Sequence, residues 1–448
     1  MLGIIGIRKE DKDIAERRAP LSPPQVKMLI DKYDLDVVVE PAENRIYANG
    51  EYESAGAVIS EKLDDCNIIF GVKEIPIERI LSGKTYCFFS HTIKGQPNNI
   101  PMLQHILNIR STLIDYEKIT DANGRRLIFF GRFAGAAGMV RSLWAFGQRL
   151  LWEGITTPFA KVKRAYEYNS LEEAKNAIKE IGEEIGNGGL HQTIVPLICG
   201  FAGYGNVSIG AQEIYNLLPY REISPEQLQE VFLQRDFSNN YVYKVVFREK
   251  DIVIPVSLNQ PFELLDYYQH PHKYQSRFST YIPFLSILIN AIYWESHYPR
   301  LVTVEYLKKL FEANKQPRLR VIGDISCDIK GSVECTVEIG DFDKPVYVFD
   351  PKSEKIQYGW EGTGPVILAL DRLPNEFAKE ATESFGEAIL PFFPELASCD
   401  FNQPFDQLVP PDEFKKAIIA HQGELTPSFR YLDSILREIC VDRLDKGN

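Results

Sequence analysis

A glycine-rich run, GYGNVSIGA at residues 203–211, restricts the possible folds of this chain more than any other segment. It follows an apolar stretch at 193–202 and precedes a helix-like segment at 212–218. A buried strand, a glycine turn and a helix N-terminus together predict half of a nucleotide-binding α/β domain, because glycines let backbone amides approach a phosphate and the helix dipole favours its negative charge. The third glycine comes two residues later than in the usual G-x-G-x-x-G pattern, so a plain strand–turn–helix connection is the alternative.

The predicted cofactor contacts begin in this run. They are Gly203, Gly205, Asn206, Val207, Ser208 and Gly210. Asn290 and Asp324 end later apolar strands, where a polar side chain can reach the nicotinamide or the ribose of a dinucleotide.

A second strand is expected at 220–223, and its end bears on the choice of cofactor. An acidic residue about 20 positions after the glycines binds the ribose 2′-hydroxyl of NAD, whereas a nearby arginine accommodates the 2′-phosphate of NADP. Glu222 favours NAD, and Arg221 with Ser224 favours NADP.

The composition is that of a globular protein with two or three domains: 448 residues, 44% hydrophobic and 25% charged. The net charge of −12 argues against a nucleic-acid partner, which would require a basic surface. No apolar run approaches the roughly 18 residues of a membrane helix. We therefore expect no membrane association, and the N-terminal sequence lacks a basic leader, so we expect a cytoplasmic location.

Neither the cysteines nor the histidines predict a metal site. Seven cysteines without a C-x-x-C pair indicate reduced thiols. Cys327 and Cys335, like His270 and His272, lack a matching set of further ligands.

Along the chain, residues 1–130 alternate short apolar runs with helical patterns, which predicts an α/β domain with parallel strands. Long helices are expected at 131–151 and 170–184. The segment 224–279 is rich in Gln, Tyr, Phe and His, contains strand-like stretches at 241–247 and 251–256, and is interpreted as an insertion in the nucleotide domain.

Titratable side chains follow several predicted strands of the first domain. Lys73 ends the strand at 68–73, His91 follows the strand at 85–90, and Glu117 follows the strand at 111–114. Ligands bind at the carboxyl ends of strands in open α/β sheets, so Lys73 and His91 are candidate proton-transfer groups, and Glu117 could tune them. The alternative is that each residue is merely structural or solvated.

Three arginines are candidates for binding a carboxylate. Arg17 and Arg18 lie just before a predicted helix that starts at residue 22, and Arg132 starts the helix at 131–151. A guanidinium binds a carboxylate through two parallel hydrogen bonds. A surface charge run is the alternative for the first two, and local pairing is the alternative for Arg132.

Several motifs in order resemble a known family. They are GIRKE at 6–10, ERRAP at 16–20, GVKE at 71–74, FFSHT at 88–92, DYEK at 115–118, FGRFAG at 130–135, the glycine run, GDISCD at 323–328, LP at 373–374 and KEA at 379–381. Over about residues 3–395 the chain is similar to the lysine-forming saccharopine dehydrogenases, and most to the lysine–ketoglutarate reductase half of bifunctional aminoadipic semialdehyde synthases. The wider superfamily includes alanine dehydrogenase and the N-terminal part of nicotinamide nucleotide transhydrogenase.

This resemblance implies an α/β fold of two Rossmann-like domains, with parallel sheets flanked by helices and a cleft between the domains. A discontinuous substrate domain would comprise residues 1–135 and 350–448. The nucleotide domain would comprise residues 136–349. A second long helix near 379–390 would lie beside the one at 131–151.

The resemblance also implies a reaction: lysine, 2-oxoglutarate and a reduced nicotinamide cofactor give saccharopine, the oxidised cofactor and water, reversibly. By family likeness Lys73 and His91 transfer protons, Glu74 and Glu117 tune them, and Arg17 with Arg18 binds substrate carboxylates. The family likeness favours NADP over NAD. The direction used in lysine metabolism is open, and a homo-oligomer is compatible with the sequence.

Two other functions are consistent with the same motifs. The first is an alanine-dehydrogenase-like amino acid dehydrogenase that releases ammonia, against which the late third glycine argues. The second is a non-catalytic nucleotide-binding regulator, against which the presence of both Lys73 and His91 argues.

Overall fold

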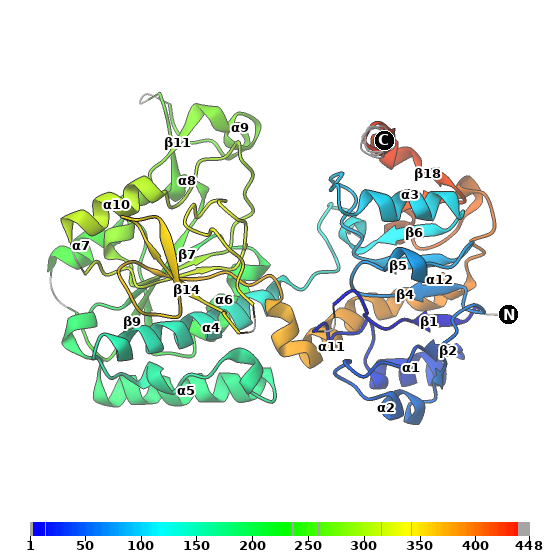
Figure 1. Ribbon diagram of the computed structural model, residues 1–448, viewed down its shortest axis with the longest axis horizontal. Coiled ribbons are helices and arrows are strands. Elements are labelled where there is room, and N and C mark those ends of the chain that lie inside the picture. The colour runs from blue at the N-terminus through cyan, green and yellow to red at the C-terminus, as the bar shows by residue number, and fades with distance from the viewer. Residues whose placement is uncertain are drawn as a thin grey trace. The chain divides into compact units, whose positions relative to one another are not determined.

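The computed structural model describes residues 3–13, 15–234, 237–257, 260–314, 316–341 and 343–437. The chain forms two compact units, of which unit 1 contains Met1–Phe130 and Ala378–Asn448 and unit 2 contains Gly131–Phe377 (Figure 1). The C-terminal segment enters unit 1 at residue 378, later than the expected residue 350. The reason is that the strands between 347 and 368 pair within the sheet of unit 2.

Unit 1 contains an eight-stranded sheet in the order β18-β17-β6-β5-β4-β1-β2-β3. Its strands are β1 (Ile5–Ile7), β2 (Val37–Val39), β3 (Val58–Ile59), β4 (Ile68–Phe70), β5 (Thr85–Phe88), β6 (Thr112–Asp115), β17 (Ile418–His421) and β18 (Glu424–Leu425). The strands β1 to β6 are parallel, and β17 and β18 add to the β6 edge in antiparallel fashion. The chain builds outward from β1 to β3 and then returns to β4 on the other side of β1, so the switch point of this doubly wound sheet lies between β1 and β4.

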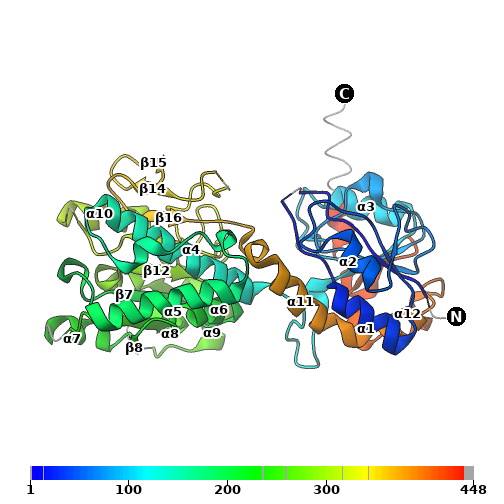
Figure 2. The ribbon, with the colours of Figure 1, turned by 90° about the horizontal axis from the view of Figure 1, so that it is seen from below.

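The helices of unit 1 cover this sheet. They are α1 (Pro23–Tyr33), α2 (Asn49–Ser54), α3 (Ile100–Asn108), α11 (Ala378–Ile389), α12 (Phe393–Ser398) and α13 (Asp412–Lys415). Prolines begin α1, where their missing N–H groups cost nothing, and Asp34 ends it in the left-handed conformation. Figure 2 shows α11 beside α1, and the side-chain amide of Gln25 in α1 donates 2.7 Å to the carbonyl of Glu383 in α11. The long helix expected at 379–390 is therefore present.

Unit 2 contains a second eight-stranded sheet in the order β15-β14-β16-β13-β12-β7-β9-β8. Its strands are β7 (Ile198–Ala202), β8 (Tyr220–Glu222), β9 (Val242–Phe247), β12 (Ile287–Asn290), β13 (Val321–Asp324), β14 (Tyr347–Asp350), β15 (Lys355–Tyr358) and β16 (Val366–Leu368). The switch point lies between β7 and β12, because the chain leaves β7 for β8 and β9 on one side and returns to β12 on the other.

The interpretation of 224–279 as an insertion was wrong in part. Its strand β9 is an inner strand of the sheet and pairs in parallel with both β7 and β8. The apolar side chains of β9 are buried in this position. The strand expected at 251–256 is present but shorter, as β10 (Val253–Pro255), because the short helix α8 (Glu249–Ile252) occupies the residues before it. That strand pairs with β11 (Tyr274–Ser276) in a separate two-stranded sheet.

Helices flank both faces of the second sheet. They are α4 (Gly131–Trp152), α5 (Leu171–Gly188), α6 (Asn206–Tyr215), α7 (Gln227–Gln234), α9 (Leu264–Gln269) and α10 (Val304–Ala313). In Figure 1, α10 lies on the opposite side of the sheet from α4 and α5. The helix expected at 212–218 begins six residues earlier, at Asn206, because Gly205 already has the extended conformation of an N-cap residue.

Two glycines allow the helices α4 and α6 to touch backbone to backbone. A Cβ atom added at Gly135 in α4 would lie 1.8 Å from the carbonyl oxygen of Val207, and one added at Gly210 in α6 would lie 1.9 Å from that of Arg132. Both distances are far shorter than any contact that carbon and oxygen allow. The late third glycine of the motif is therefore required for helix–helix packing in unit 2.

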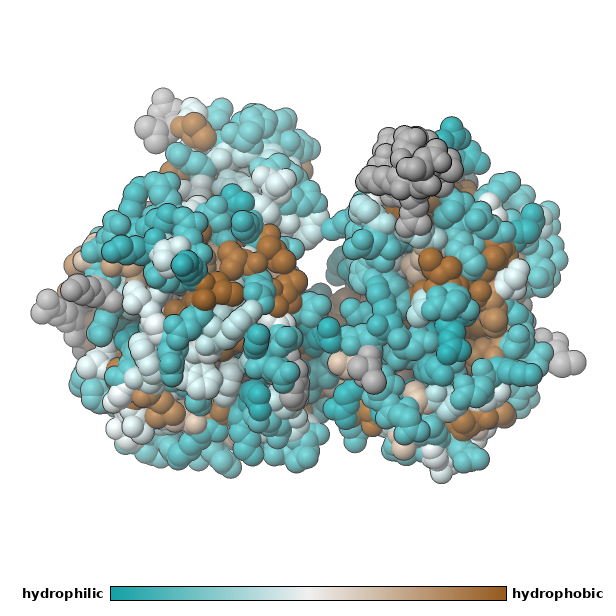
Figure 3. Space-filling view, in the orientation of Figure 1, coloured by the Kyte–Doolittle hydropathy of each residue, from teal (hydrophilic) through white to brown (hydrophobic). Residues whose placement is uncertain are grey.

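The surfaces of both units are mainly hydrophilic in the view of Figure 3, with apolar side chains gathered in separate patches. Within the described residues, no helix is both long and apolar enough to cross a membrane.

We predict that Gly210→Ala destabilises the protein by about 3 kcal/mol or more, since overpacking usually costs about 1–3 kcal/mol and here the obstacle is backbone. Gly186→Ala in α5 is the matched control, because its new Cβ would meet nothing within 4 Å. Alanine favours a helix over glycine by about 1 kcal/mol, so the control should be neutral or stabilising. Chemical denaturation of both variants checks this, and equal stabilities would contradict the packing role.

Candidate active site

The candidate catalytic residues lie at the switch point of unit 1, where the loops after β1 and β4 meet. Glu10, in the loop after β1, accepts hydrogen bonds from the amides of Val72 (2.7 Å) and Lys73 (2.9 Å), after β4. Glu10 is 6% exposed, and burial raises its pKa although the charge of Arg8 and the two amides oppose the rise. This carboxyl group fixes the backbone at Lys73, whose side chain is half-buried.

Glu74 and His91 form the central polar pair. His91 Nδ1 lies 2.8 Å from Glu74 Oε1, and the residue has a left-handed backbone with φ of 49°. Burial would raise the pKa of Glu74, but the hydrogen bond with His91 and its charge lower that pKa to about 2. Because Glu74 is thus an ionised acceptor, Nδ1 of His91 is the donor in this contact, and Nε2 is the ring nitrogen that Glu74 does not hold.

Two further residues hold Glu74, and sequence analysis had given neither a role. Lys12 Nζ lies 3.0 Å from Glu74 Oε1, and Asn99 Nδ2 donates to the same oxygen over 3.4 Å. Asn99 Nδ2 also donates to the carbonyl of His91 over 3.2 Å. Both contacts join loops far apart in sequence, so no local spacing marks them; only the presence of Lys12 close to the motif at 6–10 was a hint.

Arg17 and Arg18 differ in burial. Arg18 is buried and its Nε and Nη2 donate to the carboxylate of Glu16 over 2.7 and 2.6 Å, so this edge of the guanidinium is already occupied. Burial alone would raise the pKa of Glu16, but Arg18, assisted by the charge of Lys73, lowers it. Arg17 is exposed. Substrate-carboxylate binding by either arginine stays a prediction.

Glu117 lies in a different polar group from the one predicted. Its Oε1 is 3.4 Å from Arg126 Nη1, and its backbone amide donates to the buried Asp115 over 2.7 Å. Asp115 also accepts from the amide and the hydroxyl of Ser90, directly before His91. Burial raises the pKa of Asp115 to about 6 despite these donors. The tuning of Lys73 or His91 by Glu117 stays a prediction.

Aromatic rings form an apolar floor below these groups. Phe89 stacks against His91 with 6.3 Å between centroids, and Phe130 stacks on Phe385 of α11 at 4.8 Å. The guanidinium of Arg18 lies 4.2 Å from the centroid of the Phe130 ring. The C-terminal segment thus supports the candidate site through α11.

The glycine turn of unit 2 lies at the switch point between β7 and β12. Gly203 has φ of +98°, and a Cβ there would lie 2.9 Å from the carbonyl oxygen of Ala291, which follows β12. By contrast, a Cβ at Gly205 would meet nothing within 4 Å, so space is open at the N-terminus of α6 beside Asn206. The turn therefore fits a dinucleotide pyrophosphate, for which the first-turn amides of α6 are the donors.

Val207, Ser208 and Gly210 make contacts within unit 2. The Val207 carbonyl meets α4 at Gly135, and the buried Ser208 hydroxyl accepts 3.0 Å from Gln212 Nε2. Gly210 meets α4 at Arg132. Cofactor contacts by Val207, Ser208 and Gly210 stay predictions.

Asn290 and Asp324 are brought together but are both buried. Asn290 Nδ2 donates to Asp324 Oδ1 over 2.7 Å and to Ser332 Oγ over 2.8 Å, and Thr336 Oγ1 donates to Asp324 Oδ2 over 2.6 Å. Burial raises the pKa of Asp324 to about 6, although these hydrogen bonds favour its ionised form. The hydrogen bonds hold the ends of β12 and β13 in register. Contact of Asn290 or Asp324 with a cofactor stays a prediction.

Arg132 and Arg221, which were predicted to bind the substrate and the cofactor, have partners within unit 2. Arg132 Nε pairs with Glu213 Oε1 of α6 over 2.8 Å, which is the local pairing left open as an alternative. Arg221 lies on β8, the outer strand of the sheet, with its guanidinium 4.3 Å from the Tyr241 ring. The strand expected at 220–223 is present as β8, but the strand that adjoins β7 is β9.

Among the described residues, no group of three or more His, Cys, Asp or Glu side chains could hold a metal ion. All six described cysteines are free thiols; the seventh, Cys440, lies outside the described residues.

Residues 6–137 match the family model "Alanine dehydrogenase/PNT, N-terminal domain". The chain is 39% identical over 96% of its length to alpha-aminoadipic semialdehyde synthase of Arabidopsis thaliana, and 35% identical over 96% to the mitochondrial enzyme of that name from Mus musculus. It spans 41% and 48% of those two relatives. It is also 26% identical, over 88% of its length and 92% of the relative, to saccharopine dehydrogenase [NAD(+), L-lysine-forming] of Emericella nidulans.

Among solved structures, an L-alanine dehydrogenase matches with a TM-score of 0.59 and 19% identity, covering 96% of this chain and 99% of its own. A transhydrogenase from Sinorhizobium meliloti matches with a TM-score of 0.52 and 17% identity, covering 94% and 100%.

These comparisons confirm the resemblance to the saccharopine dehydrogenases and aminoadipic semialdehyde synthases. The family model matches residues 6–137, and the solved structures show that the whole chain has an α/β fold like that of alanine dehydrogenase. The assignment of a substrate and a nucleotide role to the two units, the cleft between them, and the cytoplasmic location stay predictions.

We predict that Asp324→Asn changes how stability depends on pH. A carboxyl group whose pKa is raised in the folded state adds stability below its unfolded pKa near 3.8, and this stability is lost as pH rises through about 6. The loss amounts to about 3 kcal/mol at about 1.4 kcal/mol per pKa unit. The asparagine amide can donate to the Thr336 hydroxyl, so the variant should fold and show a flatter profile between pH 4 and 8. Parallel profiles in chemical denaturation would contradict the raised pKa.

Proposed function

We propose that the chain is a lysine–2-oxoglutarate reductase, a saccharopine dehydrogenase of the lysine-forming type. The observation that carries the proposal is the His91–Glu74 pair next to Lys73, at the switch point of the sheet in unit 1. The 39% and 35% identical relatives named for alpha-aminoadipic semialdehyde synthase support the substrate class.

The proposed reaction needs proton transfer at two stages. The lysine ε-amine must lose a proton before its lone pair attacks the keto carbon of 2-oxoglutarate, and the hydroxyl of the resulting carbinolamine must gain one to leave as water. His91 Nε2 accepts the first proton, since Glu74 holds Nδ1. The Lys73 ammonium donates the second, from a backbone that Glu10 keeps in place.

A bound nicotinamide cofactor supplies the hydride that reduces the imine carbon to the secondary amine of saccharopine. Residues at the glycine turn, Gly203, Gly205 and Asn206, would hold its pyrophosphate, because the space beside Gly205 is open and α6 begins there.

For the cofactor itself we propose NADP, on residues other than Arg221. The strand beside β7 is β9, and the amide of Gly203 donates 3.0 Å to the carbonyl of Phe247 at its end. Arg248, Glu249 and Lys250 follow directly, at the place where a dinucleotide fold recognises the adenosine ribose. Arg248 and Lys250 are exposed cations.

The carboxylate at this position already has partners. Glu249 Oε1 accepts from the hydroxyl of Tyr268 over 2.7 Å and from that of Tyr204, within the glycine turn, over 3.4 Å. A ribose 2′-hydroxyl would have to compete with two tyrosines for this carboxylate, whereas a 2′-phosphate would find two exposed cations. The arrangement favours the phosphorylated cofactor.

We predict that Lys73→Met and His91→Gln each lower the turnover number about 100-fold or more, the scale of lost acid–base catalysis. Cofactor oxidation is followed with 2-oxoglutarate plus lysine, and in parallel with pyruvate plus ammonia. Wild-type rates in both variants would remove the assigned roles. Turnover with pyruvate and ammonia but none with lysine would replace the proposal by an alanine-dehydrogenase-like activity.

We predict further that Arg248→Gln lowers kcat/KM for NADPH at least tenfold and leaves that for NADH nearly unchanged, because only NADPH carries the 2′-phosphate. Arg221→Gln is the matched control, an arginine on the outer strand with its own aromatic partner, and should alter neither value. If the ratio of kcat/KM for NADPH to that for NADH changed in Arg221→Gln alone, the ribose site would have to lie at the end of β8 instead.

A further inference from the structure

Unit 1 contains a cavity of about 160 Å³ that none of the proposed catalytic residues lines. It lies against the face of the sheet formed by Ile69 of β4 and Tyr86 of β5, and Leu63 and Leu81 complete its apolar wall. Binding sites for drug-sized ligands usually measure about 300–1,000 Å³, so this cavity suits a ligand the size of a single amino acid.

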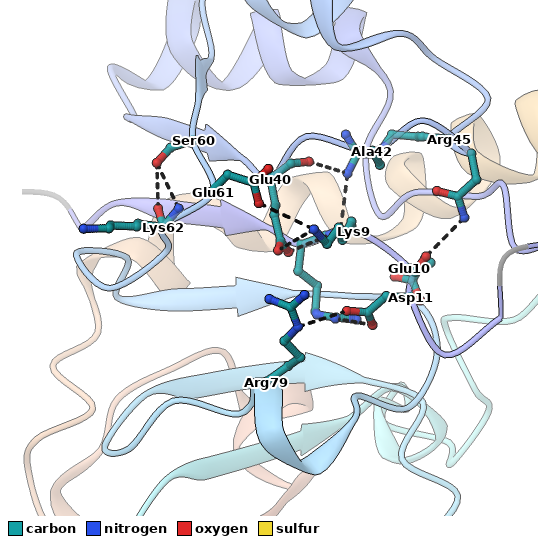
Figure 4. Close-up of polar contacts among 12 residues, drawn as sticks. Lys9, Glu10, Asp11, Glu40, Ala42, Arg45, Ser60, Glu61, Lys62 and Arg79 are labelled. Atoms are coloured by element: carbon teal, nitrogen blue, oxygen red, sulfur yellow. Dashed lines mark hydrogen bonds and ion pairs between the residues drawn. The ribbon is translucent and has the colours of Figure 1, made fainter.

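Two guanidinium groups line the cavity, and one carboxylate holds both. Arg8 Nη2 lies 2.6 Å from Asp11 Oδ1, and Arg79 Nε lies 3.8 Å from Asp11 Oδ2, as Figure 4 shows for Arg79 and Asp11. Arg8 is 4% exposed, and its Nη1 has no hydrogen-bond partner among the described residues. A buried donor without a partner is destabilising, and the carboxylate of a ligand would supply the missing acceptor.

Carboxylates line the rest of the cavity and outnumber the guanidiniums. Glu40 and Glu61 share Lys9, whose Nζ lies 3.5 Å from each (Figure 4). Asp64 and Glu78 also line the cavity, and neither has an ion-pair partner within the described part of the chain. These carboxylates do not form a metal-binding group among the described residues. Within the described residues, the lining therefore offers two carboxylates without an ion-pair partner and one guanidinium with an unpaired nitrogen, Nη1 of Arg8.

We infer that this cavity binds an α-amino acid with a second cationic group, the class to which lysine belongs. The ligand carboxylate meets Arg8 and Arg79, its ammonium groups meet Asp64 and Glu78, and its methylene chain lies on the apolar wall. A neutral or acidic amino acid would leave one of the two carboxylates without a cation. The site is separate from the proposed catalytic groups and is therefore a second, effector-type site for the proposed substrate class.

Arg8 connects the cavity with the catalytic segment. Its charge acts on Glu10, which binds the amide of Lys73, and its side chain packs against Gly71, where a Cβ would lie 3.2 Å from the Arg8 methylenes. A ligand that binds Arg8 thus contacts the residue whose charge acts on Glu10, and Glu10 is the carboxyl group that holds the Lys73 amide. The identity of the effector rests on the proposed function; the existence of the site does not.

Isothermal titration of the whole chain, without cofactor or 2-oxoglutarate, tests the inference with L-lysine as the probe. We expect a lysine-binding event that Arg79→Gln and Glu78→Gln each weaken at least tenfold. Arg125→Gln is the matched control, an exposed arginine paired with Asp121 as Arg79 is with Asp11, and should leave the event unchanged. L-norleucine, which lacks the second cation, and 1,5-diaminopentane, which lacks the carboxylate, should bind at this event at least tenfold more weakly.

Isotherms of Arg79→Gln and Glu78→Gln that match the wild type, or an equal loss in Arg125→Gln, would overturn the inference. Turnover is measured on the same samples to separate the two proposals. The event without lysine-dependent turnover would support the site and refute the proposed function. Turnover without an event sensitive to these substitutions would refute the site alone.

Discussion

The buried carboxyl group of Glu10 is the contact on which the candidate site depends most. It joins the loop after β1 to the loop after β4 across the switch point, through the amides of Val72 and Lys73. The chain leaves the two paired strands β1 and β4 in opposite directions at such a point, so the strand pairing itself does not fix the loops. The hydrogen bonds of Glu10 supply that restraint, and Lys73 and Glu74 start from it. His91 is then positioned by Glu74, and Lys12 and Asn99 by the same carboxylate.

The same principle operates in unit 2 with backbone in place of a carboxyl group. Gly203 passes against Ala291 after β12, and Gly135 and Gly210 let α4 and α6 meet without side chains between them. Because α4 and α6 are fixed to each other, the N-terminus of α6 has a set position relative to the ends of β7 and β12. A phosphate site needs amides that are already aligned, and close helix packing provides that alignment.

Local patterns predicted much of this structure. Apolar runs and prolines located α1, α4 and α5, and the order of the motifs predicted the two-unit fold and α11. Contacts across long sequence separations were not predictable, because no spacing encodes them. Glu10 reaches Lys73 over 63 residues and Asn99 reaches Glu74 over 25. The bidentate pair of Glu16 with Arg18 could be predicted only if the burial of Arg18 were known, since an exposed arginine at that position would be available to a substrate carboxylate.

Strand order shows most clearly what a linear pattern lacks. Counting about 20 residues past the glycines leads to Arg221 and Glu222, on the assumption that the next strand in sequence is the next strand in space. The exposed, polar β8 is instead an edge strand, and the buried, apolar β9 takes the inner position. A short run of Tyr, Arg and Glu was a sign of an edge, because an inner strand needs apolar residues on both faces. Since a ribose site is expected at the end of the strand that is next in space, we place the proposed one at Arg248 and Lys250 and not at the end of β8. Part of the segment 224–279 then belongs to the proposed cofactor site.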